Sequence, residues 1–123
     1  MTTAPEILVV DDDPAICNLA RAALESAGYR VWTAQNGLDA LQQLSECHPN
    51  IRLLLTDISM PFMNGIALAE VLRRRNPELP VLYVSGSLDK VRSLIGASVT
   101  LPKPFTVGQL LERVEILISP RAH

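Results

Sequence analysis

The segment ILVVDDDP at residues 7–14 decides how the start of the chain folds. Its first four residues form an uninterrupted apolar run of branched side chains, which is typical of a strand buried on both faces of a sheet. The acidic triplet ends this strand, and Asp13 before Pro14 is a favourable N-cap and first position for a helix. The segment therefore predicts a buried parallel strand that delivers Asp11 and Asp12 to its carboxyl end.

The same alternation of strand and helix continues along the chain. The first helix is expected to end at Gly28, and further helices are expected from Asn36-Gly37 to about His48, from about Ile66 to Arg75, within 88–97 and after Thr106. Short apolar runs predict the other strands at 30–34, 51–56, 80–84 and 99–101. Five buried strands alternating with helices predict an α/β fold with a parallel sheet covered on both faces.

The overall composition limits the classes of function. A chain of 123 residues with a formal charge of −2 fits one domain, expected over 1–123 with a core at about 7–118, and carries no bulk attraction to nucleic acid or an anionic membrane. No signal segment or membrane-spanning apolar run is visible, so we expect a cytoplasmic protein. Cys17 and Cys47 are too few for a metal knuckle or disulfide framework and are expected to be reduced.

Polar residues stand at the ends of four predicted strands. These are Asp11 and Asp12, Asp57, Ser85 and Lys103. In an open parallel sheet, ligands bind beyond the carboxyl ends of the strands. We therefore expect three carboxylates, a hydroxyl and an ammonium group to meet at one edge of the sheet.

This set of side chains favours phosphoryl chemistry with a hard metal ion. Clustered carboxylates raise one another's pKa unless a cation joins them, and carboxylate oxygens suit Mg²⁺, or Mn²⁺ in its place. Asp57 at the centre is placed as a nucleophile that can form an acyl phosphate. Lys103 and the Ser85 hydroxyl can then contact the phosphoryl oxygens.

Several motifs together resemble the response-regulator receiver family. They are LVVDDDP at 8–14, LTD at 55–57 followed by MP at 60–61 and NG at 64–65, and KPF at 103–105. Their order and spacing match the family from about Ile7 to Leu117. The resemblance implies a flavodoxin-like, doubly wound sheet of five parallel strands in the order 2-1-3-4-5.

The resemblance also implies a role for each candidate residue. Asp57 is the implied phosphoacceptor, with Ser85 and Lys103 contacting the phosphoryl group, and the Lys103–Pro104 peptide bond is expected to be cis. Asp13 is interpreted as a helix cap. The implied metal ligands are Asp11, Asp12, Asp57 and the backbone carbonyl of Ser59.

The sequence departs from the family at one important position. Receivers commonly carry Tyr or Phe three residues before the lysine, and Thr100 stands there in this chain. The usual coupling between the hydroxyl and an inward-swinging ring therefore cannot operate from this position. The segment between Ser85 and Lys103 is also short, so the usual output surface cannot be transferred to this chain.

Three functions remain open on the sequence. The first is a phosphoacceptor receiver of a two-component phosphorelay, charged by a sensor histidine kinase or phosphotransfer protein and catalysing only its own phosphorylation and dephosphorylation. Its output partner is unknown, and a phosphorylation-dependent dimer is one form that output can take. The alternatives are a degenerate receiver that binds its partner without phosphate, and a Mg²⁺-dependent phosphohydrolase that uses an aspartyl phosphate.

Overall fold

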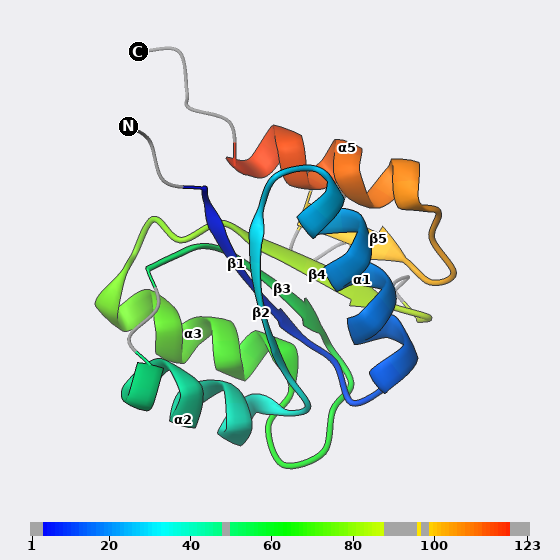
Figure 1. The fold of residues 1–123 in the computed structure, drawn as a ribbon. Helices are drawn as coiled ribbons and strands as arrows, with labels where there is room; N and C mark the ends of the chain where they lie inside the picture. Colours follow the sequence, from blue (N-terminus) through cyan, green and yellow to red (C-terminus); the bar gives the residue numbers. More distant parts are fainter. Residues whose placement is uncertain (1–3, 48–49, 88–95, 97–98, 119–123) are drawn as a thin grey trace.

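The computed structural model describes residues 4–47, 50–87, 96 and 99–118. Within them, five strands form one parallel sheet, with their carboxyl ends at a common edge (Figure 1). The strand order is β2-β1-β3-β4-β5, which confirms the doubly wound order expected from the motifs. The strands are β1 (Glu6–Val10), β2 (Arg30–Ala34), β3 (Ile51–Asp57), β4 (Val81–Ser85) and β5 (Thr100–Pro102).

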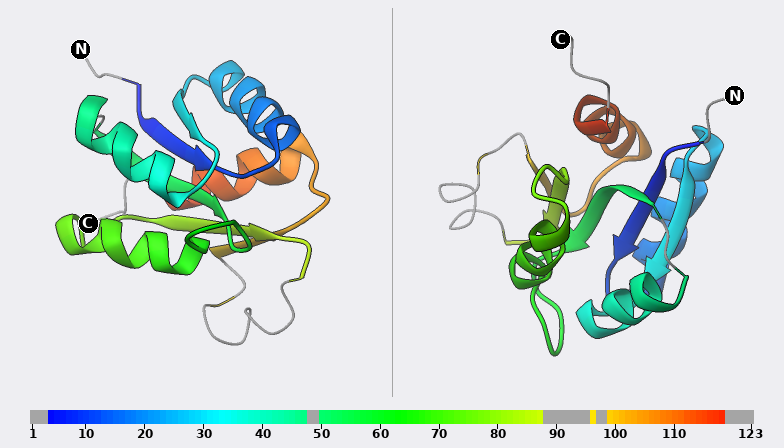
Figure 2. Two further views of the ribbon diagram at one scale, coloured as in Figure 1. Left: turned by 90° about the horizontal axis from the view of Figure 1, so that it is seen from below. Right: turned by 90° about the vertical axis from the view of Figure 1, so that its left-hand side faces the viewer.

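Helices cover both faces of this sheet. On one face lie α1 (Pro14–Ser26) and α5 (Val107–Ile118), and on the other lie α2 (Gly37–Cys47) and α3 (Gly65–Arg75) (Figures 1 and 2). The helix predicted within 88–97 falls almost wholly outside the described residues. In the part of the chain that the structure describes, no helix is long and apolar enough to cross a membrane.

The alternation of side chains along each strand builds two separate cores. In β1, Ile7 and Val9 pack in the core under α1 and α5, whereas Leu8 and Val10 pack in the core under α2 and α3. All four side chains are essentially inaccessible to solvent. Since burying one such side chain stabilises the fold by about 1.5–3 kcal/mol, the apolar run in β1 is a major source of stability.

The predicted helix signals are also confirmed. The Asp13 side chain accepts a hydrogen bond from the Ala15 N–H at 2.9 Å, and Pro14 occupies the first helical position of α1. Gly28 adopts a φ of 96° just after α1, in the left-handed region that glycine enters without steric cost. These signals place the start of α1 directly after Asp11 and Asp12, so the acidic residues stay at the sheet edge.

Candidate functional site

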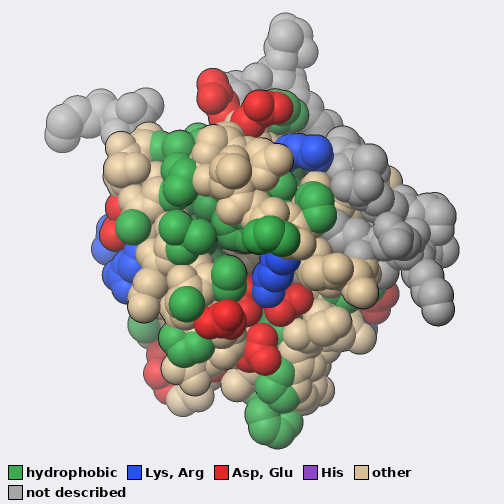
Figure 3. Space-filling view, turned by 90° about the vertical axis from the view of Figure 1, so that its right-hand side faces the viewer, with side chains coloured by type: hydrophobic (Ala, Val, Ile, Leu, Met, Phe, Trp, Pro, Cys, Tyr) green, Lys and Arg blue, Asp and Glu red, His purple; other side chains and the backbone are tan. Residues whose placement is uncertain are grey.

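An acidic cluster lies at the carboxyl edge of the sheet. One carboxylate oxygen from each of Asp11, Asp12 and Asp57 lies within 4.8 Å of the others. Asp11 and Asp57 are buried, with 2% and 6% of their surface exposed, whereas Asp12 is exposed. Figure 3 shows acidic side chains gathered next to a basic one on this face of the molecule. The structure therefore brings together the three carboxylates that the sequence analysis expects to meet.

Backbone hydrogen bonds that extend the sheet hold these residues in place. The Asp11 N–H donates to the Ala34 carbonyl at 3.1 Å, which ties the end of β1 to β2. The Lys103 N–H donates to the Ser85 carbonyl at 2.9 Å, which ties the residue after β5 to the end of β4. The positions of the site residues thus follow from the strand register and do not depend on loop conformation alone.

Lys103 joins two of the three carboxylates. Its Nζ lies 2.9 Å from Asp11 Oδ2 and 3.1 Å from Asp57 Oδ2. The Lys103–Pro104 peptide bond is cis, as predicted. Three carboxylates and one ammonium group carry a formal charge of −2, which one divalent cation would balance. From its sequence position Lys103 is expected to contact the phosphoryl group, and its direct contact with Asp11 is not predictable from that position.

The ion pairs and the burial act in opposite directions on the pKa values at the site. Burial is the largest influence on Asp11 and raises the pKa of its carboxyl above 3.8, although the Asp13 N–H and Lys103 both favour the charged form. For Lys103, burial lowers the pKa, but the hydrogen bonds to Asp11 and Asp57 outweigh it and the net direction is upward. Lys103 therefore stays charged, while Asp11 bears an uncompensated cost of burial.

Local hydrogen bonds orient the remaining oxygens of the buried acids. Asp57 Oδ1 accepts from the Ser59 N–H at 3.1 Å, and Asp11 Oδ1 accepts from the Asp13 N–H at 2.9 Å. The Cys17 thiol donates to the Asp11 carbonyl at 3.4 Å, and burial raises the pKa of this thiol to about 11. Cys17 thus supports the backbone of the site as a neutral donor, a role that its sequence position does not reveal.

The sequence singles out three further residues, which are Ser85, Ser59 and Thr100. Ser85 is buried at the end of β4, one residue beyond the Val84–Asp57 register pair, and its Oγ accepts from the Ser87 N–H at 3.1 Å. Ser59 contacts Asp57 through its N–H, and its carbonyl remains a predicted metal ligand only. Thr100 is fully buried in β5.

The donor set fits a hard divalent cation. The three carboxylates offer oxygen ligands only, and Asp12 is open to solvent, so water can complete the coordination of an ion such as Mg²⁺. A softer metal that prefers sulfur ligands finds none here, since the buried Cys17 thiol faces backbone carbonyls.

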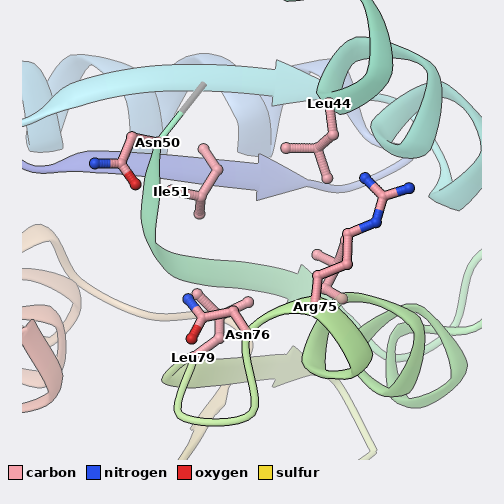
Figure 4. Close-up of a pocket in the computed structure, with 7 residues that line it drawn as sticks. Leu44, Asn50, Ile51, Arg75, Asn76 and Leu79 are labelled. Carbon is pink, nitrogen blue, oxygen red and sulfur yellow. The ribbon is translucent and has the colours of Figure 1, made fainter. Parts of the chain in front are cut away.

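A separate surface pocket lies at the opposite end of the sheet. Leu44 of α2, Ile51 at the start of β3 and Leu79 form apolar parts of its lining, and Arg75 and Asn76 add polar groups from the end of α3 (Figure 4). None of the acidic cluster lines it. Because the strands run away from this pocket toward the acidic edge, the pocket takes no part in the site.

Comparison with known proteins agrees with the geometry. The "Transcriptional regulatory protein CpxR homolog" of Haemophilus influenzae is 39% identical over 120 residues, which cover 95% of this chain and 52% of that protein. The chain thus spans about half the length of this curated relative.

Two solved structures share the fold. The chemotaxis protein CheY4 of Vibrio cholerae gives a TM-score of 0.83 at 26% identity, covering 93% of this chain and 98% of its own. The response regulator TrrA of Thermotoga maritima, solved with Mg²⁺ and BeF, gives 0.78 at 30% identity, covering 92% and 98%. The sequence matches the "Response regulator receiver domain" family over residues 7–115. The chain therefore belongs to the response regulator receiver domain family.

Proposed function

We propose that this receiver domain accepts a phosphoryl group on Asp57 in a Mg²⁺-dependent reaction and thereby changes how it binds a partner. The observation that carries the proposal is the set of contacts around Asp57. Its carboxylate lies among two further carboxylates and accepts a hydrogen bond from Lys103 at the carboxyl edge of a parallel sheet. Family membership supports the proposal, because it makes the chain a module of two-component signalling.

The proposed reaction is a transfer between two proteins. An Asp57 carboxylate oxygen attacks the phosphorus of a phosphohistidine, the new O–P bond forms as the P–N bond breaks, and the imidazole nitrogen keeps the electron pair. The product is an acyl phosphate. Hydrolysis by water later releases inorganic phosphate and restores the carboxylate, so the domain processes its own modification and no metabolite.

The surrounding residues each have a role in this proposal. Asp11, Asp12, Asp57 and the Ser59 carbonyl are the proposed ligands of Mg²⁺, which would neutralise charge on the phosphoryl oxygens. Lys103 already contacts the Asp57 oxygen and can follow the phosphoryl group as a point charge. The Ser85 hydroxyl, on the neighbouring strand, can donate to a phosphoryl oxygen.

The proposed donor is a sensor histidine kinase or a phosphotransfer protein of a phosphorelay, acting in the cytoplasm. The output of the domain depends on the protein to which it is joined or to which it binds. The relative from Haemophilus influenzae is named as a transcriptional regulator and is about twice as long as this chain. The output function of that relative does not carry over to this chain, because the chain matches only about half of the relative's length.

Intact-mass spectrometry after incubation with acetyl phosphate and Mg²⁺ tests the proposal. We expect the wild type to gain one phosphoryl group, Asp57→Asn to gain none, and Asp39→Asn, which alters an acid outside the cluster, to behave as the wild type. Unmodified wild type would favour a receiver that works without phosphate. Continuous release of phosphate from p-nitrophenyl phosphate would instead favour the phosphohydrolase.

A further inference from the structure

The loop between β3 and α3 presents an exposed aromatic ring beside the proposed phosphorylation site. Phe62 is 81% exposed, more than the other exposed large hydrophobic side chains of the described residues. The loop that carries it projects beyond the carboxyl edge of the sheet in Figures 1 and 2. A single exposed apolar residue is ordinary on a protein surface. Phe62 differs from such a residue in its backbone conformation, its neighbours and its location.

The backbone of Phe62 is strained. Its φ is 73°, and it is the one non-glycine residue with a positive φ among the described residues. This left-handed conformation suits glycine or asparagine, whereas it is unfavourable for a bulky side chain. The position therefore carries a ring where a smaller residue would suit both the backbone and the solvent.

The residues around Phe62 hold the loop firmly. The Gly65 N–H donates to the Ile58 carbonyl at 3.0 Å and closes the loop at its base. Met63, the residue after Phe62, packs closely against Gly37. A Cβ added to Gly37 would lie only 2.9 Å from the Met63 Cβ. The ring is thus presented from an ordered support, and exposure of Phe62 is not a consequence of a loose loop.

Chain geometry keeps this ring close to Asp57. A Cβ on Gly65 would collide with the Asp57 carbonyl, so the two backbones touch. Phe62 is three residues from Gly65, hence at most about 11 Å away between Cα atoms. An ordinary protein interface covers about 800 Å² on each partner, a patch of about 16 Å radius. A donor protein whose contact patch is centred near Gly65 can therefore cover Phe62 while it reaches Asp57.

Leu38 adds a second apolar group to the same edge. It is 54% exposed in the first turn of α2 and follows Gly37, which contacts the loop through Met63. We propose that Phe62, supported by Leu38, is an anchor on which the phosphodonor protein docks its own apolar surface. The inference rests on the proposed function, because it assumes that the donor is a protein that reaches Asp57.

The test compares two phosphodonors on the same variants. Phe62→Asn removes the ring and suits the left-handed backbone, Phe62→Tyr keeps a ring, and Ile116→Asn removes an apolar side chain that is 65% exposed near the end of α5. The small donor is acetyl phosphate. The protein donor is the autophosphorylated core of the source organism's histidine kinase that transfers fastest to the wild type.

With the kinase core we expect Phe62→Asn to raise the KM for transfer about tenfold at an unchanged kcat, as expected for loss of an aromatic anchor. Phe62→Tyr and Ile116→Asn should stay within twofold of the wild type. With acetyl phosphate all four proteins should react at the same rate. This pattern would separate docking from the chemistry at Asp57.

Other results would overturn the inference. It fails if Phe62→Asn accepts phosphate from the kinase as well as the wild type does, if Phe62→Tyr is as poor as Phe62→Asn, or if Phe62→Asn is also slow with acetyl phosphate. It fails too if acetyl phosphate modifies the wild type and no kinase core does. If acetyl phosphate leaves the wild type unmodified, the proposed function itself is wrong.

Discussion

Lys103 acts as an internal counter-ion in the described structure. Its ammonium group contacts both buried carboxylates, at 2.9 Å and 3.1 Å, and so occupies part of the space between Asp11 and Asp57. A divalent cation that binds the same oxygens must share them with this ammonium group. Asp11 retains a raised pKa despite its contact with Lys103, because burial outweighs the ion pair.

The raised pKa of Asp11 predicts the effect of Asp11→Asn on stability. Because the pKa of Asp11 is raised, the folded state binds a proton here more tightly than the unfolded chain does, so the charged carboxylate costs stability above its folded pKa. We expect Asp11→Asn to raise the free energy of unfolding at pH 7 by on the order of 1 kcal/mol. Urea denaturation in a buffer without metal ions measures this change in the free energy of unfolding.

The pH dependence provides the control for this prediction. The gain should shrink as the pH falls through the raised folded-state pKa of Asp11 and should vanish below 3.8, where the wild-type carboxyl is protonated in both states. A less stable Asp11→Asn protein at pH 7 would mean that the ion pair with Lys103 outweighs the burial of Asp11.

Residue types at strand ends are enough to predict which side chains meet at the site. Asp11, Asp12, Asp57 and Lys103 each follow an apolar run, and the parallel sheet brings these positions to one edge. Their individual contacts are not predictable in this way, because they depend on side-chain rotamers. The bridge from Lys103 to Asp11 and the bond from Cys17 to the Asp11 carbonyl are examples.

At the scale of elements, the end of β3 and the start of α3 are in close backbone contact. A Cβ at Gly65 would meet the Asp57 carbonyl and would lie 3.0 Å from Thr56 Cγ2. Asn64 caps α3 by accepting from the Ala67 N–H at 2.8 Å, so the helix cannot easily move away. The start of α3 is therefore coupled mechanically to the position of Asp57.

We predict that Gly65→Ala lowers the free energy of unfolding by about 1–3 kcal/mol, the usual cost of overpacking, and slows phosphorylation by acetyl phosphate. Gly108→Ala in α5 is the matched control, since its Cβ would meet only Thr106 Oγ1 at 3.9 Å. It should stabilise the helix by up to about 1 kcal/mol without changing the phosphorylation rate. Equal effects of the two substitutions would show that the β3–α3 contact is unimportant.

Strands and helices are predictable to within one or two residues wherever their ends carry strong local signals. The start of α1 at Pro14 agrees because Asp13 and Pro14 define it locally, whereas β3 extends one residue beyond the predicted Thr56. Contacts between elements need the register as well. The Trp32 indole donates to Glu6 Oε1 at 2.8 Å, and this bond exists only because β1 and β2 pair in register.

At the scale of the whole molecule, the site lies at one edge of the sheet and the two cores lie on its faces. Buried residues of β1, β3 and β4 pack against helices on both faces, whereas the carboxylates lie at or just beyond the carboxyl ends of β1 and β3. Substitutions among the exposed acids should therefore leave the folded structure intact. The stability of the entire domain can then report what binds at the edge of the sheet.

A cation that binds the folded state alone stabilises the domain by RT ln(1 + [L]/Kd), or about 1.4 kcal/mol at a free concentration ten times Kd. We predict that Mg²⁺ stabilises the wild type in this way and that Asp12→Asn loses most of the gain, because Asp12 supplies one oxygen of the cluster. Thermal and urea unfolding across a Mg²⁺ titration measure the stabilisation of the wild type and its loss in Asp12→Asn.

Asp13→Asn is the control that makes this prediction specific. Asp13 is the next acid along the chain and is also exposed, but its side chain caps α1 by accepting from the Ala15 N–H. Asparagine caps a helix about as well, so Asp13→Asn should keep both the basal stability and the response to Mg²⁺. If Asp13→Asn loses the response as fully as Asp12→Asn does, the ion is bound by the acidic segment as a whole, and the assignment of Asp12 as ligand and Asp13 as cap is wrong.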